Sequence, residues 1–316
     1  MENRGWQVCT LYIEKSGRIT DYKDAACKRE HKSMNIEFSI DKYEDLLENG
    51  KFKEASAYRA GFIPDVLYKF VPLYDDSTST DEREKDRNLK RFSSLEKSEI
   101  WFSSRKAMND PFEFAGIYID ELKLCNSGWN PDTIAKIKQD LMDLFFLASF
   151  TSNMSDNLPM WAHYANNHAG YCVQYKVDKK ENVHRAMYLG KRYPIANTIK
   201  KFVGYGCMQN DTTVLPEKRE WARIEFQKCL ALIQEMYTIK HNSWSYENEF
   251  RLLCDSLPDK FGRNMSAASM GLTPTDVYCG VNCSDKHIEK IQSISKKTGL
   301  LFHRCKLSQT DYLIID

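Results

Sequence analysis

Residues 145–150 read FFLASF, and this unbroken apolar run predicts a buried central strand. Directly before it, residues 131–144 predict a helix, because apolar side chains recur at spacings of three and four. These side chains are Ile134, Ile137, Leu141 and Leu144. Strands and helices do not alternate with the glycine turns of a doubly wound sheet. The sequence therefore favours an α+β fold with a mixed or antiparallel central sheet flanked by helices.

Further elements are expected on both sides of this run. The longest helix is predicted over 216–241, with Pro216 in its first turn. Other helices are expected at 88–97 and at 285–298, and Ser284 is a plausible cap for the second. The polar segment 75–88, DDSTSTDEREKDRN, predicts a loop. Strands are predicted at 66–73, 100–103, 249–254, 276–281 and 300–305.

The chain is expected to divide into an N-terminal extension, residues 1–64, and an α+β core domain, residues 65–316. Residues 6–24 alternate apolar and polar positions and predict a β-hairpin. Residues 39–60 predict a helical hairpin, with Ser39 as a cap and a break at Asn49-Gly50. This hairpin is similar to half a tetratricopeptide unit, and we expect it to be a docking surface for a protein partner.

Charge and composition limit the classes of function. The 316 residues include 45 Lys plus Arg and 44 Asp plus Glu, so the net charge is +1 and any site for a polyanion must be local. No apolar run is long enough for a bilayer span. Ten cysteines at irregular spacing favour reduced thiols over a disulfide framework. We therefore expect a cytoplasmic protein with no membrane partner.

The sequence contains no glycine-rich phosphate loop, Rossmann fingerprint, nucleophile elbow or His-Glu-x-x-His. Three clusters of polar and aromatic residues remain, at 109–113, 160–170 and 240–251. In the first cluster, Asn109-Asp110-Pro111 predicts a turn, and Phe112 is expected to plug a core.

In the second cluster, a helix would place Trp161, Tyr164 and His168 on one apolar stripe. The aromatic residues of this stripe are expected to be core. His163 lies off the stripe, and it either lines a cleft or is a satisfied buried histidine.

The third cluster contains WSYENEFR, residues 244–251, which alternates like a strand. This pattern would place Glu247, Glu249 and Arg251 on one face of the strand. Two like charges at i and i+2 cost energy unless a cation or a substrate lies between them. A surface ion ladder with Arg251 and a working site both stay open.

Two patterns bear on metal binding. Cysteines and a histidine recur every four residues over 279–287, but the short paired knuckles of structural zinc modules are absent, so no metal ligand is assigned. Asp110, followed by Glu121 and Lys123, nominally fits a metal-dependent nuclease, in which carboxylates hold magnesium and a lysine assists the attacking water. This nuclease is an alternative function.

Taken in order, the motifs resemble a widespread bacterial domain family of unknown function, whose members occur near phage-resistance, abortive-infection and toxin loci. The resemblance spans about residues 66–305 and leaves the first 64 residues outside it. The motifs are Leu67-Tyr68-Lys69-Phe70, Ile100-Trp101-Phe102-Ser103-Ser104, Asn109-Asp110-Pro111-Phe112, Met160-Trp161-Ala162-His163-Tyr164-Ala165 with His168 and Gly170, and Trp244-Ser245-Tyr246-Glu247-Asn248-Glu249-Phe250-Arg251.

The layout of this family is remotely similar to that of ADP-ribosyltransferases. The resemblance implies that NAD is the substrate and that a macromolecule, protein or nucleic acid, accepts the ADP-ribose. It implies that Glu249 binds the nicotinamide ribose and supports an oxocarbenium-like transition state, and that Glu247 orients the acceptor.

The resemblance also implies a set of residues around the dinucleotide, in which Lys69 stands where such enzymes usually offer Arg or His. The set is Tyr68, Lys69, Ser103, His163, Tyr164 and Arg251. A non-enzymatic sensor or binding module, with the aromatic clusters as core, is a further alternative.

Overall fold

The structure, a computed structural model, describes residues 38–75, 82–108, 110, 112–114, 116–257, 260–311 and 314–315. All of these residues belong to one compact unit, Phe38–Asp316. The β-hairpin predicted at residues 6–24 lies outside the described residues.

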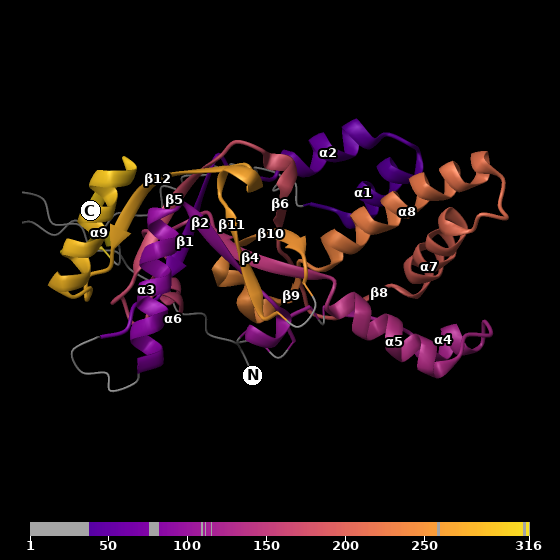
Figure 1. Cartoon of the computed structure of the whole chain (residues 1–316), viewed down its shortest axis with the longest axis horizontal. Coiled ribbons are helices and arrows are strands. Elements are labelled where there is room, and N and C mark those ends of the chain that lie inside the picture. Colours follow the sequence, from indigo (N-terminus) through magenta and orange to yellow (C-terminus); the bar gives the residue numbers. More distant parts are fainter. Residues whose placement is uncertain are drawn as a thin grey trace, which may run out of the picture. The chain divides into compact units, whose positions relative to one another are not determined.

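The described residues form a mixed, mostly antiparallel sheet of nine strands (Figure 1). One path through the sheet runs β11-β2-β4-β1-β5-β12-β13, and β10 pairs with both β4 and β6. Only the β12–β13 pairing is parallel within this sheet. This architecture confirms the α+β fold. The strands are β1 (Val66–Val71), β2 (Glu99–Ser103), β4 (Phe145–Thr151), β5 (Tyr171–Val177), β6 (Val183–Arg185), β10 (Glu249–Asp255), β11 (Gly262–Ser266), β12 (Leu272–Cys279) and β13 (Leu301–Arg304).

Strand β4, which contains the FFLASF run, lies at the centre of the sheet, as predicted. Along one edge it pairs with β10 over its whole length, from Phe145 opposite Asp255 to Thr151 opposite Glu249. Along the other edge it meets β2 near its beginning and β1 at its end, where Tyr68 lies opposite Thr151. Tyr68, Thr151 and Glu249 therefore form one row across three strands that are far apart in the sequence.

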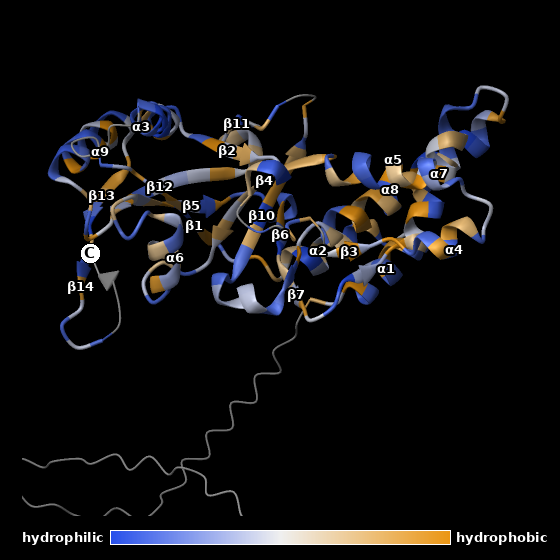
Figure 2. Ribbon diagram, turned by 90° about the horizontal axis from the view of Figure 1, so that it is seen from below, coloured by the Kyte–Doolittle hydropathy of each residue, from blue (hydrophilic) through white to orange (hydrophobic). Residues whose placement is uncertain are grey.

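Helices flank the sheet at both ends. Helices α3 (Glu82–Glu96) and α9 (Asp285–Thr298) pack together near β12, and α3 is mostly hydrophilic on its surface (Figures 1 and 2). A larger group gathers at the other end: α1 (Ile40–Glu48), α2 (Phe52–Ala60), α4 (Glu121–Cys125), α5 (Pro131–Met142), α7 (Ala196–Asn210) and α8 (Pro216–Met236). Helix α6 (Leu158–Tyr164) packs on β1.

Smaller elements complete the described part of the chain. Three two-stranded pairs are β3 (Ile117–Tyr118) with β8 (Tyr193–Pro194), β7 (Met187–Leu189) with β9 (Ile239–His241), and β14 (Lys306–Leu307) with β15 (Ile314–Ile315). Four short 3-10 helices are η1 (Arg105–Ala107), η2 (Lys180–Asn182), η3 (Asn242–Glu247) and η4 (Ala268–Met270). No helix among the described residues is both long and apolar enough to cross a membrane.

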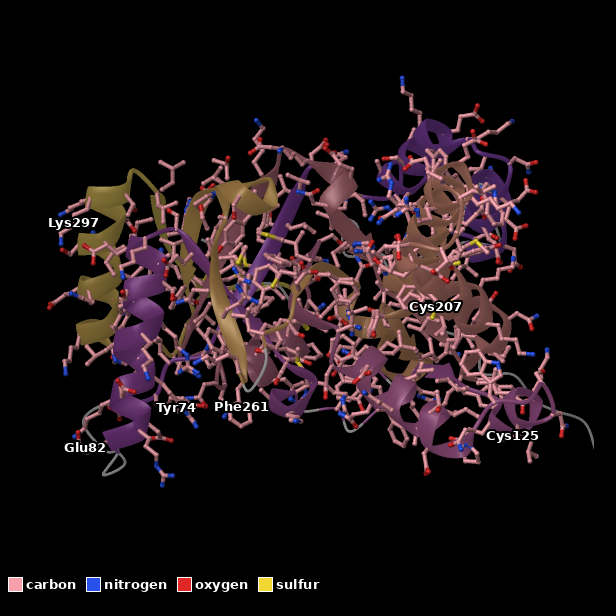
Figure 3. All side chains as sticks on the ribbon, turned by 45° about the vertical axis from the view of Figure 1, so that its right-hand side comes forward. Tyr74, Glu82, Cys125, Cys207, Phe261 and Lys297 are labelled. Atoms are coloured by element: carbon pink, nitrogen blue, oxygen red, sulfur yellow. The ribbon has the colours of Figure 1, made fainter. Side chains whose placement is uncertain are left out.

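Several predicted element ends are confirmed and others are wrong. Ser39 and Ser284 cap α1 and α9, because each side-chain oxygen accepts a backbone N–H three residues on. Helix α3 begins at Glu82 (Figure 3), so the predicted loop 75–88 is wrong from that residue onward. Ion pairs within the helix, such as that between Asp86 and Lys90 at 2.6 Å, support this polar first half. The helix predicted over 216–241 ends at Met236.

The predicted helical hairpin, α1 and α2, packs on the rest of the described unit. Tyr43 and Leu47 of α1 are buried in the same apolar cluster as residues of α8. Arg59 of α2 is also buried, and its guanidinium lies 3.3 Å from the Glu235 carboxylate of α8. His184 of β6 lies 2.8 Å from the same carboxylate oxygen. A charged network thus joins α2, α8 and the strand beside β10.

Candidate functional site

The strand register brings distant segments of the chain to one cavity of about 150 Å³, lined by residues of β1, β4, α6, η3 and β10. Ala107, Met108, Asp110 and Glu113 close another part of its wall. Five residues of the predicted site line this cavity: Tyr68, Lys69, Tyr164, Glu247 and Glu249.

The two glutamates reach the cavity through a turn that differs from the prediction. Residues 242–247 form the 3-10 helix η3, so the strand predicted over 244–251 is wrong before Glu249. Asn248 adopts a left-handed conformation, with φ of 41°, and its side-chain amide donates to the Ser152 hydroxyl. Asparagine tolerates this conformation better than most residues. The turn allows both glutamates to converge on one ammonium.

That ammonium belongs to Lys240 of β9, and it is the centre of a buried charge cluster. Its Nζ lies 2.5 Å from Glu247 Oε2, 3.1 Å from Glu249 Oε2 and 4.0 Å from Glu113 Oε2. Arg251 binds Glu249 through two N–H groups, each at 2.9 Å, and lies 2.7 Å from Glu113. All five side chains are buried. The cluster therefore contains three carboxylates and two cations in contact with one another.

The cations set the protonation of Glu249. Burial alone would raise the pKa of Glu249, but Arg251 and Lys240 outweigh burial and lower this pKa to about 2. The pKa of Glu113 is raised, mainly by burial, against the opposing effect of Arg251. Burial tends to lower the pKa of Lys240, but the carboxylates, Glu249 first, raise it above its ordinary value. Glu249 is thus a carboxylate and Lys240 an ammonium at neutral pH.

Lys69 lines the cavity together with Lys240, but its surroundings differ. Its ammonium donates to the Ser149 carbonyl oxygen at 3.1 Å and lies 5.1 Å from the centre of the Phe150 ring. Among the described residues, no carboxylate lies within ion-pair distance of it. Burial lowers the pKa of Lys69 to about 8, although Glu249 acts in the opposite direction. Lys69 therefore offers a poorly compensated positive charge to the cavity.

Hydroxyl groups complete the surroundings of the two glutamates. The Tyr164 hydroxyl donates to Glu247 Oε1 at 2.5 Å, and the Tyr188 hydroxyl accepts the backbone N–H of Glu249 at 2.8 Å. Burial and the Glu247 charge both raise the pKa of Tyr164. Tyr164 is therefore a hydrogen-bond donor that fixes the orientation of Glu247.

The motif around Trp161 is largely structural. Trp161 is fully buried and donates its indole N–H to the Met154 carbonyl at 2.9 Å. Helix α6 ends at Tyr164, so the predicted helical stripe to His168 is wrong; three residues, Asn166 to His168, have positive φ. This bend still stacks the His168 ring on Trp161, with 6.0 Å between ring centres.

Three predicted dinucleotide residues lie away from the cavity surface. His163 is exposed on α6 and does not line the cavity, so neither alternative considered for it, cleft residue or buried histidine, describes its position. Ser103 lies in β2, opposite Leu147, and does not line it either. Arg251 is fully buried behind Glu249, so it holds the glutamate and does not face the cavity.

The residues of the nuclease alternative are not brought together. Asp110 lies at the cavity, where its carboxylate accepts the Phe112 N–H at 2.8 Å, as the predicted turn requires. Asn109 and Pro111 of that turn lie outside the described residues. Phe112 is exposed, so it does not plug a core. Glu121 and Lys123 are exposed on α4, and Glu121 pairs with Lys138.

The structure also describes the cysteines and histidines considered for metal binding. Among the described residues, no group of three or more His, Cys, Asp or Glu side chains is arranged to hold a metal ion. The eight described cysteines are free thiols; Cys125 and Cys207, for example, lie on the helical side of the unit (Figure 3).

Residue-by-residue reasoning missed four members of the site: Glu113, Tyr188, Lys240 and Trp244. Three of them lie within the clusters at 109–113 and 240–251 but received no role. Lys240 is buried in the short strand β9, Ile239–His241, where a buried charge requires partners, but its two neighbours in the strand do not reveal that burial in the sequence. Tyr188 gives no signal in the sequence either.

Comparison with known proteins gives a limited result. No curated protein and no solved structure matches this chain. A family model matches one part of residues 66–305, the range over which the motifs resemble a bacterial family. The matched part contains Tyr164, Lys240, Glu247 and Glu249. Residues 160–252 match the model of a family described as "Protein of unknown function (DUF2971)".

Proposed function

We propose that the cavity beside Glu249 cleaves NAD and transfers its ADP-ribose to a macromolecular acceptor. The observation that carries the proposal is the meeting of Lys69, a half-buried cation without an ion-pair partner among the described residues, with Glu247 and Glu249 at a single cavity. Lys69 lies about 180 residues before these two glutamates in the sequence. Buried charges with perturbed pKa values in a cavity are typical of working sites.

In the proposed reaction, the bond between the nicotinamide nitrogen and ribose C1′ breaks, and its electron pair leaves with neutral nicotinamide. The Glu249 carboxylate stabilises the positive charge that develops on the ribose. It is suited to this role because its pKa of about 2 keeps it ionised. Ser149 also lines the cavity and contributes to the lowered pKa of Glu249. A ribose hydroxyl of the substrate would donate to the Glu249 carboxylate.

The acceptor nucleophile then forms a bond to C1′, and its proton passes to Glu247. Tyr164 and Lys240 each bond one oxygen of Glu247, so its carboxylate is fixed in orientation. Arg251 is a positioning residue here, because it holds Glu249 from the side away from the cavity. The volume of about 150 Å³ suits a single ring with its ribose better than a whole dinucleotide, since cofactor pockets span roughly 300–1,000 Å³.

The test is the release of nicotinamide from NAD by the purified protein, with and without a cell extract that supplies acceptors. We expect turnover by the wild type and a loss of at least about 100-fold in Glu249→Gln, as for removal of one group that stabilises transition-state charge. Glu289→Gln is the matched control, because Glu289 is exposed on α9. Absence of turnover and of NAD binding in the wild type, or equal turnover in Glu249→Gln, would contradict the proposal.

A further inference from the structure

A second cavity, of about 460 Å³, adjoins the first. The two cavities share Asp110, Lys240 and Trp244 in their walls. The pairing of β7 with β9 forms the second cavity, because Leu189 lies opposite His241 and brings residues 189–192 beside residues 239–244. A ligand that occupies one cavity can therefore extend into the other past Lys240 and Trp244.

The second cavity carries uncompensated positive charge. Lys191 and Arg192 line it and are exposed, and neither has an ion-pair partner within the described part of the chain. His241 adds an imidazole to the lining, Lys240 is already paired with Glu247 and Glu249, and Asp110 is the acidic residue that lines this cavity. The whole chain has a net charge of only +1, so this local concentration is a property of the cavity.

Aromatic rings lie beside these cations. Phe112 is 59% exposed, although it is a large apolar side chain, and the Arg192 guanidinium lies 5.4 Å from its ring centre. Trp244 is half-buried, and the Lys240 ammonium lies 4.9 Å from its ring. A planar aromatic group bound here would have ring faces to stack on, and an anion would have a guanidinium that forms bidentate bonds to phosphate.

We propose that the second cavity binds a nucleotide, with its phosphates at Lys191 and Arg192 and its base against Phe112 or Trp244. Identification of this nucleotide with the ADP half of NAD rests on the proposed function. The first cavity would then hold the nicotinamide ribose. The combination of unpaired cations with exposed aromatic rings favours a nucleotide over a simple anion, which needs no ring to stack on.

The experiment is a calorimetric titration of the full chain with ADP and, separately, with inorganic phosphate. We expect ADP to bind the wild type at least about tenfold more tightly than phosphate. We expect the double variant Lys191→Gln, Arg192→Gln to bind ADP at least about tenfold more weakly, since it removes both charged hydrogen-bond donors from the phosphates. The matched control is Lys53→Gln with Lys218→Gln, two exposed lysines on α2 and α8 that line neither cavity.

The outcomes separate this proposal from the proposed function. ADP binding equal to phosphate binding, no ADP binding, or equal ADP binding by wild type and double variant would each overturn the nucleotide site. If Glu249-dependent release of nicotinamide persists in those cases, the proposed function stands without this site. If ADP binds through Arg192 but the wild type does not cleave NAD, the nucleotide site stands and the transferase fails.

Discussion

Replacement of Lys69 by methionine is expected to stabilise the fold at neutral pH while removing a residue of the site. A pKa lowered from 10.5 to about 8 means that the buried ammonium costs roughly 3 kcal/mol relative to the neutral amine. Two effects reduce the gain from removing it. The cavity leaves Lys69 partly accessible, and its bond to the Ser149 carbonyl, of about 1 kcal/mol, is lost. We therefore expect Lys69→Met to be more stable by about 1–2 kcal/mol.

The pH dependence gives this prediction its sharpest test. The folded-state pKa of Lys69 is lowered, so its cost is fully present below about pH 8 and disappears as pH rises toward the unfolded value of 10.5. Urea unfolding of both proteins at about pH 7 and about pH 9.5 should show the advantage of the variant shrinking. Lys176→Met is the control, because Lys176 is exposed on β5, and it should change stability by less than about 0.5 kcal/mol. A Lys69→Met protein that is less stable than wild type at neutral pH would refute the reasoning.

Three further predictions follow from the same cluster. Arg251→Met should lower the free energy of unfolding by about 3–5 kcal/mol, because it leaves two buried carboxylates without their main partner; a urea midpoint like that of wild type would contradict this. The pKa of Glu249 is about 2 in the folded state and 4.5 in the unfolded state. Its contribution to the free energy of unfolding is therefore complete above pH 4.5 and is lost as the pH falls toward 2. Glu249→Gln should therefore lose less stability than wild type over that window in acid titration monitored by circular dichroism. If the proposed NAD cleavage occurs, a chelator should leave its rate unchanged, because the proposed step depends on the Glu249 carboxylate; a rate that the chelator abolishes and magnesium restores would contradict that mechanism.

The elements that could be predicted are those with a local signal. The FFLASF run is buried because every side chain in it is apolar or small, and Ser39 and Ser284 cap helices through their own side chains. Helix α7 was missed, since only three of its 15 residues are buried and its apolar face is weakly defined. The η3 helix was predicted as a strand because alternation over four residues does not distinguish the two, and the left-handed Asn248 has no sequence signal.

The candidate site shows the same limit. Which residues face Glu249 depends on the register of β1 and β10 against β4, which pairs segments up to 110 residues apart. Periodicity within a segment carries no information about such pairings. The family resemblance supplied Tyr68 and Lys69 as partners of Glu249, and the register places them at the same cavity. The prediction about Arg251 identified an important residue but assigned it to the ligand, since burial is set by the neighbours and not by the motif.

The contact between Arg59 and Glu235 limits how far the chain can be shortened from its N-terminal side without disturbing the strands beside the candidate site. Glu235 is 1% exposed, and α2 supplies the guanidinium that compensates its charge. His184, which contacts the same carboxylate, lies directly opposite Arg251 in the strand pairing. Expression from residue 65 would remove the Arg59 guanidinium and leave the Glu235 carboxylate with His184, one strand away from the residue that holds Glu249. A shortened chain that keeps this charged network must therefore include Arg59 of α2, because the helical hairpin belongs to the same compact unit as the candidate site.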